Sequence, residues 1–415
     1  MFQNSRTRIG AALATLAVAA LVATGCAGDG GGSGGGGGDA SPIKVGQITT
    51  ISGGYPFGDT VPGTQSYVNW LNDNGGVNGH PVEFVSGDDK GDAAEAAQLA
   101  RKMVQQDGVV GMVGNTSLVD CQANRAMYEG NNVAVIGGGA VTDCFQQPNW
   151  APVNSGPFVG VWTVWTYVYE QFQPDKACFV GQNDPTSVPY FEQLAADFRA
   201  EYGMNIVLTH TNDASQDPTP AVTNAKSEGC DVVIMTTVAP NFAAFVNTAK
   251  SVGLDATFIC GGSCYDAGLP ETLGANGEPG ALGPNSKGVY VAAELAPIDD
   301  PNENIQAMLD QFEADGVDAN FWSQIGWLSA KVFFEGLAQN PDADVTTAEG
   351  VLDQLRGMEF IDTGFAATPL GFGDGETHAP NLGGRVLVVQ DGGFSDAPGQ
   401  DGGWTVIEPL PAPEG

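Results

Sequence analysis

Two short segments contain residues that could hold a metal ion or carry out redox chemistry. CGGSC places Cys260 and Cys264 close together, and GDDKGD does the same for Asp88, Asp89 and Asp92. The cysteine spacing differs from the CxxC of redox and zinc sites and no histidine lies near it, while the acid spacing does not match a calcium loop. Asp92 is better suited to capping the helix that follows it. We therefore expect no metal ion and no cofactor.

The residue types that catalysis most often uses are scattered. The three histidines, His80, His210 and His378, lie far apart in the sequence, which makes acid–base chemistry hard to assemble. The chain has no GxSxG, Walker or HExxH motif, and IGGGAVT lacks the last glycine and the acidic partner of a dinucleotide-binding loop. We expect no catalytic residues and a protein that is not an enzyme.

Length and charge narrow the class of protein further. The 415 residues exceed one ordinary core, which predicts two lobes with room for a cleft. Fifteen basic against 49 acidic residues give a formal net charge of −34, which repels the phosphates of nucleic acids and anionic lipid surfaces. We expect no nucleic-acid partner and interpret the acidity as a solvated exterior.

The N-terminal segment predicts the compartment. Two arginines precede IGAALATLAVAALVAT, a run too short and too alanine-rich for a comfortable membrane span, which is typical of a secretory signal. The run ends in LVATGC, which resembles the lipobox of bacterial lipoproteins, although Ala23 stands where leucine is commoner. The resemblance implies a signal peptide over 1–25 and a lipidated Cys26 opening a glycine-rich tether over 26–42; simple secretion is the alternative. No later segment is apolar enough to cross a bilayer, so we expect the rest outside the cytoplasm, anchored to the outer face of the cell membrane only through the lipid.

Beyond Pro42, short β-rich runs alternate with helical patterns, which predicts parallel sheets wrapped in helices. One series runs from a strand at 43–51 to a strand at 133–136, and a second runs from a helix at 159–172 to a strand at 257–259. Between helix and strand, LNDNGGVNGHPVEF has the glycines of a tight corner, because a phosphate-binding loop would lead from a strand into a helix instead. The repeated series predicts two lobes of the same build.

Several segments in order resemble the type I periplasmic binding proteins of ABC importers, specifically the branch that binds branched-chain amino acids. The match covers most of residues 43 to about 339. Each segment alone is a weak signal, but the series is a strong one. The segments are IKVGQITTISGGYPFG, NDNGGVNGHPVEFVSGDD, ARKMVQQDGVVGMVG, VAVIGGGA, PDKACFVGQND and GCDVVIM followed by AKSVGL. The resemblance implies an α/β fold of two doubly wound parallel-sheet lobes, joined by three crossover segments and closing on a ligand like a flytrap. Lobe 1 would comprise 43–154 and 297–382, and lobe 2 would comprise 155–296 and 383–415.

The resemblance also implies where a ligand would bind, although the family's anchors are altered. The family holds an amino acid's carboxylate with serine and threonine hydroxyls and backbone N–H groups, and its ammonium with an acid. Those positions fall here on Leu118, Val141 and Gly262, and Asp266 is the nearest acid to the last of them. Backbone N–H groups near Leu118 could still hold an anion, whereas the ammonium partner has no obvious replacement.

The expected ligand is small and mostly apolar, with one polar or anionic end: an amino-acid-like molecule, a carboxylate or an amide. The protein would be a monomer that delivers this ligand to ABC permease subunits; a sensor lipoprotein that signals to a membrane receptor is the alternative, and an enzyme is less favoured. The residues expected to bind the ligand are Tyr55, Phe57, Thr116, Ser117, Leu118, Ala140, Val141, Tyr190, Val238, Ala239, Tyr265, Asp266, Phe321 and Trp322. Trp162 and Trp165 recur at helical spacing and are interpreted as packing residues.

Six cysteines remain after Cys26, an even number in an oxidising compartment, which predicts three disulfides. The sequence alone leaves all 15 connectivities of six cysteines open. The topology implied by the resemblance favours pairs between neighbouring elements. These are Cys121 with Cys144, Cys178 with Cys230, and Cys260 with Cys264.

Overall fold

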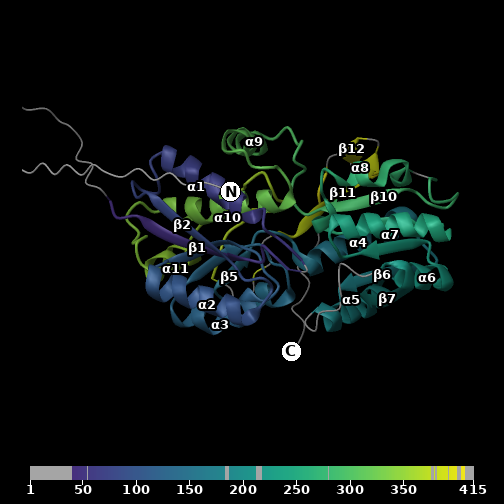
Figure 1. Cartoon of the computed structure of the whole chain (residues 1–415), viewed down its shortest axis with the longest axis horizontal. Coiled ribbons are helices and arrows are strands. Elements are labelled where there is room, and N and C mark those ends of the chain that lie inside the picture. Colours follow the sequence, from purple (N-terminus) through teal and green to yellow (C-terminus); the bar gives the residue numbers. More distant parts are fainter. Residues whose placement is uncertain are drawn as a thin grey trace, which may run out of the picture. The chain divides into compact units, whose positions relative to one another are not determined.

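The computed structural model describes residues 40–53, 55–182, 187–211, 217–278, 280–374, 378, 381–390, 392–399 and 403–406 (Figure 1). The predicted signal peptide, Cys26 and the glycine-rich segment up to 39 lie outside the described residues. Within those ranges, no helix has both the length and the apolar character needed to cross a membrane.

The first sheet is entirely parallel. Its strands stand in the order β2 (Val82–Asp88), β1 (Ile43–Thr49), β3 (Gly111–Asn115), β4 (Ala134–Gly137) and β5 (Trp150–Pro152). Side chains alternate between its two faces, so that Val135 packs with one cluster while Ala134 and Ile136 pack with the other. One face is covered by α1 (Thr60–Asp73), α10 (Phe321–Ala338) and α11 (Ala348–Arg356). The other face is covered by α2 (Ala93–Lys102), which continues as a π-helical turn (Met103–Asp107), and by α3 (Asp120–Gly130).

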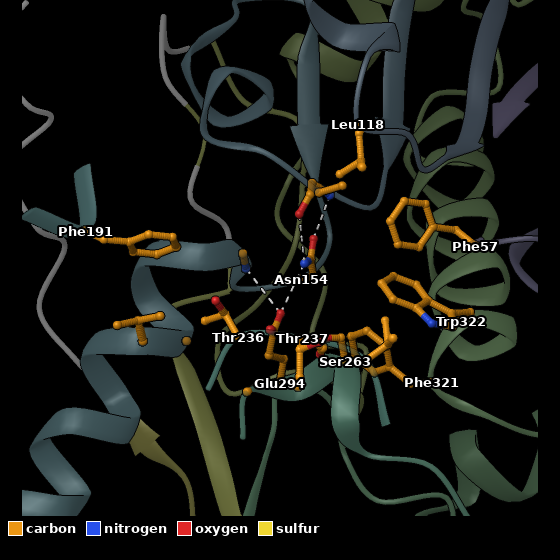
Figure 2. Close-up of a pocket in the computed structure, with 18 residues that line it drawn as sticks. Phe57, Leu118, Asn154, Phe191, Thr236, Thr237, Ser263, Glu294, Phe321 and Trp322 are labelled. Carbon is orange, nitrogen blue, oxygen red and sulfur yellow. Dashed lines mark hydrogen bonds between the residues drawn. The ribbon is translucent and has the colours of Figure 1, made fainter. Parts of the chain in front are cut away.

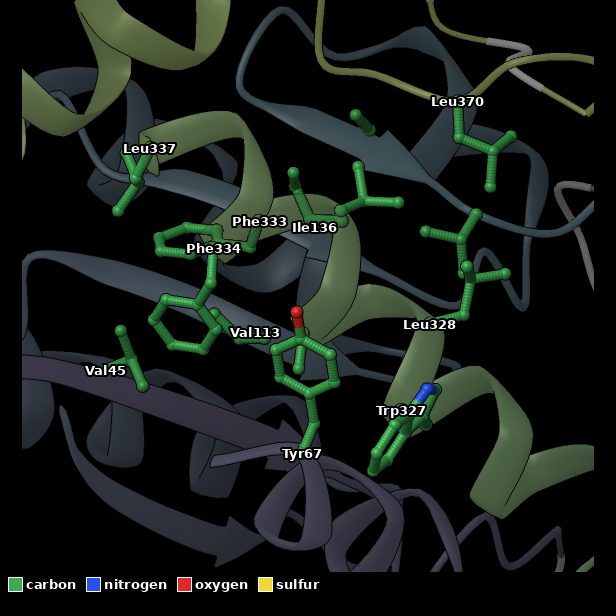
Figure 3. Close-up of a cluster of buried hydrophobic side chains, with 14 of the residues drawn as sticks. Val45, Tyr67, Val113, Ile136, Trp327, Leu328, Phe333, Phe334, Leu337 and Leu370 are labelled. Atoms are coloured by element: carbon green, nitrogen blue, oxygen red, sulfur yellow. The ribbon is translucent and has the colours of Figure 1, made fainter. Parts of the chain in front are cut away.

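Helix α10 is the central element of the larger core in this lobe (Figure 3). Its Phe333, Phe334 and Leu337 lie with Val45 and Val113 of the sheet in one buried cluster. A Cβ at Gly63 of α1 would collide with the backbone of Ser323, and one at Gly326 of α10 would collide with that of Thr60. The two glycines therefore let the helices cross in close contact, which fixes the N-terminus of α10.

The second sheet is parallel with antiparallel strands added at one edge. Its order is β12 (Gly393–Asp396), β11 (Gly383–Gln390), β10 (Val289–Ala293), β9 (Thr257–Cys260), β8 (Val232–Met235), β6 (Ala177–Gln182) and β7 (Ile206–Thr211), with β13 (Thr405–Val406) on β11. Strand β11 runs antiparallel to β10, and β12 and β13 run antiparallel to β11. Helices α4 (Gly156–Phe172) and α5 (Ser187–Tyr202) cover one face, and α6 (Thr219–Glu228), α7 (Ala239–Val252) and α8 (Leu269–Leu273) cover the other. The predicted fold of two helix-wrapped, mainly parallel sheets is confirmed.

The chain passes between the sheets three times: from β5 to α4, from β10 to α9 (Glu303–Asp315), which packs on α1, and back to β11. Side chains tie these crossings together. Asn154 Nδ2 in the first crossing donates to Glu294 Oε2 in the second (3.1 Å), and Asn381 Nδ2 in the third donates to the Glu294 carbonyl (2.6 Å). The exact lobe limits given above stay predictions.

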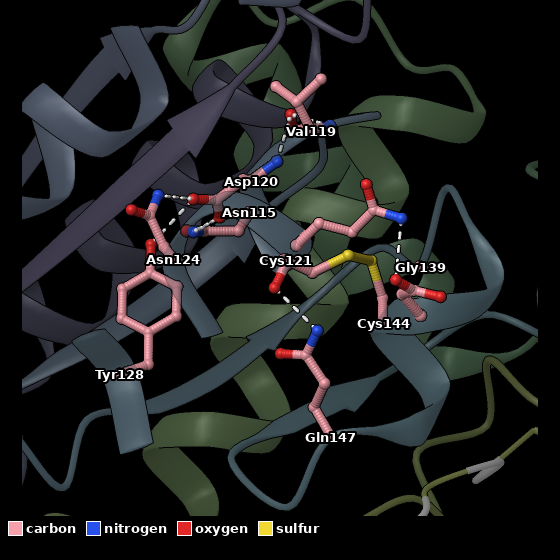
Figure 4. Close-up of a disulfide and its surroundings, with 12 residues drawn as sticks. Asn115, Val119, Asp120, Cys121, Asn124, Tyr128, Gly139, Cys144 and Gln147 are labelled. Carbon is pink, nitrogen blue, oxygen red and sulfur yellow. Dashed lines mark hydrogen bonds between the residues drawn. A yellow bond between two sulfur atoms is a disulfide. The ribbon is translucent and has the colours of Figure 1, made fainter. Parts of the chain in front are cut away.

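The three predicted disulfides are all present. Cys121 on α3 is bonded to Cys144 in a 3-10 turn (Thr142–Gln146), with 5.4 Å between the Cα atoms (Figure 4). Cys178 on β6 is bonded to Cys230, which leads into the neighbouring β8, and Cys260 closes a short loop with Cys264.

Other local predictions are also confirmed. Gly75, Gly76 and Gly79 adopt positive φ, which makes the corner before β2. Asp92 Oδ1 caps α2 by accepting from the N–H groups of Ala94 (2.8 Å) and Glu95 (2.9 Å). Trp162 and Trp165 are buried in the core of the second lobe, where both rings meet Phe198 edge-on.

Candidate functional site

A cavity that is partly open to solvent is lined by residues of both lobes. Most of its lining residues follow the carboxyl ends of strands: β1, β3 and β4 in the first lobe, and β8, β9 and β10 in the second. The N-terminus of α10 and parts of α4 and α5 complete the lining. Ligand sites of α/β proteins lie at such strand ends.

Aromatic side chains form one wall of the cavity (Figure 2). The ring centroid of Trp322 lies 4.7 Å from that of Phe57 and 4.8 Å from that of Phe321. Phe57 comes from the loop after β1, and the other two rings begin α10, where the Asn320 side chain accepts from the N–H groups of Trp322 and Ser323. The cap and the tight contact between α1 and α10 therefore hold this wall in place.

The wall contributed by the second lobe contains a buried carboxylate, Glu294, directly after β10. Its Oε2 accepts hydrogen bonds from Asn154 Nδ2 (3.1 Å), the Ser155 N–H (3.0 Å) and the Gly156 N–H (3.2 Å) (Figure 2). Burial raises the pKa of Glu294 to about 7, and these hydrogen bonds oppose that rise. Asn154 is itself oriented because its Oδ1 accepts from the Gly139 N–H (2.8 Å).

Glu294 occupies space that a side chain at Gly262 would need. A Cβ built on Gly262 would lie 2.6 Å from Glu294 Cγ and 2.7 Å from Oε1. Gly262 is the position at which the resemblance implies an acid, and the buried carboxylate beside it comes from the next strand. Glu294 is therefore a candidate acid that the sequence analysis did not name. The sequence signal was a single acid ending the buried run VYVAA.

Hydroxyl groups add polar atoms to the same wall. Ser263 Oγ donates to the Thr237 carbonyl (2.5 Å), and Thr237 Oγ1 accepts from Asn241 Nδ2 (3.3 Å). Thr236 Oγ1 is buried and has no hydrogen-bond partner among the described residues. Thr236 is thus a hydroxyl that a ligand could engage.

Two of the N–H groups near Leu118 already have an acceptor within the protein. Ser117 Oγ accepts from the N–H groups of Val119 (3.0 Å) and Asp120 (3.1 Å), and it donates to the buried carboxylate of Asp89. Asp120 is also fully buried, and burial raises its pKa to about 6 (Figure 4). The N–H groups of Val119 and Asp120 are therefore satisfied, and the two carboxyl groups beside them disfavour an anion at these donors.

The structure brings part of the predicted site together. Residues that line the cavity as expected are Phe57, Leu118, Ala140, Val238, Phe321 and Trp322. Residues that do not line it are Tyr55, Thr116, Ser117, Val141, Tyr190, Ala239, Tyr265 and Asp266. Val141 and Tyr190 belong to hydrophobic cores instead, and the Tyr265 hydroxyl accepts from the Ile298 N–H (3.0 Å). Lining residues that the sequence analysis missed include Asn154, Phe191, Thr236, Ser263 and Glu294.

Two α/β lobes around a shared, largely apolar cavity define a bilobal ligand-binding protein. A family model described as periplasmic binding protein matches residues 42–393, and the chain belongs to this family. The family consists of extracytoplasmic substrate-binding proteins, so the chain is a binding protein and not an enzyme.

The chain is similar to several characterised proteins. It is 24% identical over 303 residues to the leucine-, isoleucine-, valine-, threonine-, and alanine-binding protein of Pseudomonas aeruginosa, covering 70% of this chain and 75% of the relative. A branched chain amino acid ABC transporter from Thermus thermophilus with bound valine shares the fold with a TM-score of 0.74 at 18% identity, covering 86% of this chain and 96% of that chain. The fatty acid ABC transporter substrate-binding protein from Thermomonospora curvata does so with a TM-score of 0.70 at 17% identity, covering 90% and 93%.

Proposed function

We propose that this protein captures a small, mostly apolar, amino-acid-like solute in the cavity between its lobes and delivers it to the permease of an ABC importer. The observation that carries the proposal is the cavity itself, which combines an aromatic wall from one lobe with a buried carboxylate and hydroxyl groups from the other. The names of the relatives support it, since they describe binding of leucine, isoleucine and valine and transport by ABC systems.

Solute binding would be coupled to movement of the lobes. A solute that touches one lobe in an open form gains contacts with the other lobe when the cavity closes, which shifts the equilibrium toward closure. The closed form is then the one that docks on the permease. A sensor would use the same movement, but the relatives named for transport favour import.

The membrane attachment belongs to the same proposal. Cys26 would carry the lipid, and the glycine-rich segment after it would let a monomeric binding domain stand away from the outer face of the membrane. Growth with a radiolabelled fatty acid should label the wild-type protein and not Cys26→Ser. Equal labelling of both proteins would rule out this anchor.

Thermal unfolding tests solute capture directly. The mature chain, carrying Cys26→Ser to prevent lipidation, is heated with and without each member of a panel of amino acids, amines, amides and carboxylates. A solute at a hundred times its dissociation constant adds about 2.7 kcal/mol to the free energy of unfolding, a clear shift in Tm. A panel that produces no shift would contradict solute capture.

A further inference from the structure

We propose that the cavity selects a primary amine on an apolar body, that Glu294 binds the ammonium group, and that the described lining residues offer no cation to a carboxylate. The inference rests on the proposed function, because it names the class of solute that the same cavity takes.

The Glu294 carboxylate lines the cavity and is held in place by hydrogen bonds. Those from Asn154, Ser155 and Gly156 end on Oε2, and the Gly262 backbone also donates to the carboxylate. Oε1 lies beside two glycines, since a Cβ would be 2.7 Å from it at Gly262 and 3.3 Å from it at Gly160. The space at Gly262 is filled by Glu294 itself, whereas Gly160 has no side chain that would cover this oxygen.

The charge of Glu294 has no cationic partner in the cavity. Among the described residues that line it, Glu294 is the only one with an ionisable side chain. Arg385, on the adjacent strand β11, is paired with Asp300 (2.7 Å) and Asp396 (2.7 Å). A buried carboxylate is stabilised by an opposite charge. The ammonium group of a ligand would provide the positive charge that the described lining residues lack.

A carboxylate on the same ligand finds no comparable partner. No lysine, arginine or histidine occurs among the described lining residues, and the N–H groups of Val119 and Asp120 are satisfied by Ser117. Leu118 presents an apolar side chain to the cavity. Transfer of an unpaired carboxylate into such a cavity is unfavourable.

The aromatic wall opposite Glu294 is suited to the apolar body of the ligand. Figure 2 shows Phe57, Phe321 and Trp322 together on one side, away from Phe191. Aromatic rings pack well against a branched alkyl or phenyl group. An amine bound at Glu294 with such a body would bridge the two lobes.

Two matched sets of probes separate the amine from the carboxylate. One set is 3-methylbutylamine, leucine and 4-methylpentanoate, and the other is 2-phenylethylamine, phenylalanine and 3-phenylpropanoate. Calorimetric titration of the mature chain at pH 8 should show binding of both amines, binding of the amino acids at least about tenfold weaker, and no binding of the acids. Glu294→Gln should weaken amine binding by about 100-fold, while Asp299→Asn, an exposed acid on the same crossing, should leave it unchanged.

The outcomes separate this inference from the proposed function. Amino acids that bind as tightly as the amines, or acids that bind better, would overturn the amine assignment while leaving solute capture intact. Failure of all six probes would also overturn it, and solute capture would then be decided by the wider thermal panel. If Glu294→Gln does not fold, the wild-type protein provides the test: amine affinity should fall about tenfold per pH unit below pH 7, and a constant affinity would overturn the role of Glu294.

Discussion

The carboxylate of Glu294 lies over Gly262, so closely that a methyl group on Gly262 would come within 2.7 Å of Oε1. The two residues belong to different strand ends, β9 and β10, that lie side by side in the second sheet. The Glu294 side chain can therefore occupy this place because Gly262 has no side chain.

Gly262→Ala should destabilise the protein by about 1–3 kcal/mol, because the new methyl group collides with a buried side chain. Gly261→Ala is the matched control, since a Cβ there meets no atom closer than 4.0 Å. Urea unfolding of both variants measures the difference. Equal stability would mean that Glu294 can move away without cost.

The stability of Glu294→Gln should depend on pH differently from that of the wild type. Because the pKa of Glu294 is raised from 4.5 to about 7, the folded state holds the proton more tightly than the unfolded state. The cost of burying the charge is absent below pH 4.5 and fully present above pH 7. The wild type should therefore lose about 3 kcal/mol relative to the variant across this window, as measured by urea unfolding at a series of pH values. Parallel profiles would contradict the burial of an ionisable Glu294.

Removing an aromatic ring should weaken solute binding. Trp322→Ala takes away a ring that packs on both Phe57 and Phe321, and we expect a loss of about 1–3 kcal/mol in binding free energy. Phe360→Ala removes a ring that is 52% exposed and outside the cavity lining, so it should have no effect. Calorimetry with the tightest-binding solute of the panel compares the two. A similar loss in both would indicate a general effect of aromatic deletion on the fold.

A disulfide that closes a longer loop should add more to the free energy of unfolding than one that closes a shorter loop. Replacing Cys178 and Cys230 by alanine opens a loop with a sequence separation of 52 and should cost about 4 kcal/mol, whereas replacing Cys260 and Cys264, separated by 4, should cost about 2 kcal/mol. Unfolding under non-reducing conditions gives both values. A reversed order would show that packing around the sulfur atoms outweighs chain entropy.

Much of the fold could be predicted because its signals are local. The alternation of strands and helices, the glycine corner before β2 and the Asp92 cap each depend on a few adjacent residues. The disulfide pairs followed once neighbouring strands were inferred from the topology. Helices α9 and α11 were not predicted, although both end in a typical way, with glycine following the last turn.

The site could be predicted only in part, because it depends on contacts between distant residues. Phe57, Phe321 and Trp322 were expected to bind the ligand, and the structure places them in the cavity. Glu294 was not among the residues expected to bind the ligand. Its role requires the Asn154 side chain and the space above Gly262, and no pattern in the sequence brings these together.

The three crossings of the chain meet at Glu294, which is bonded to Asn154 through its side chain and to Asn381 through its carbonyl. Atoms near a rotation axis travel least when two bodies turn about it, and the crossings are where such an axis must run. An ionic contact at Glu294 would therefore survive opening and closing with little change in length. The rings of Phe57 and Trp322 belong to the other lobe, so their contacts with the solute would form on closure and break on opening. The charge would then retain the solute in both states, and the aromatic wall would distinguish the closed state from the open one.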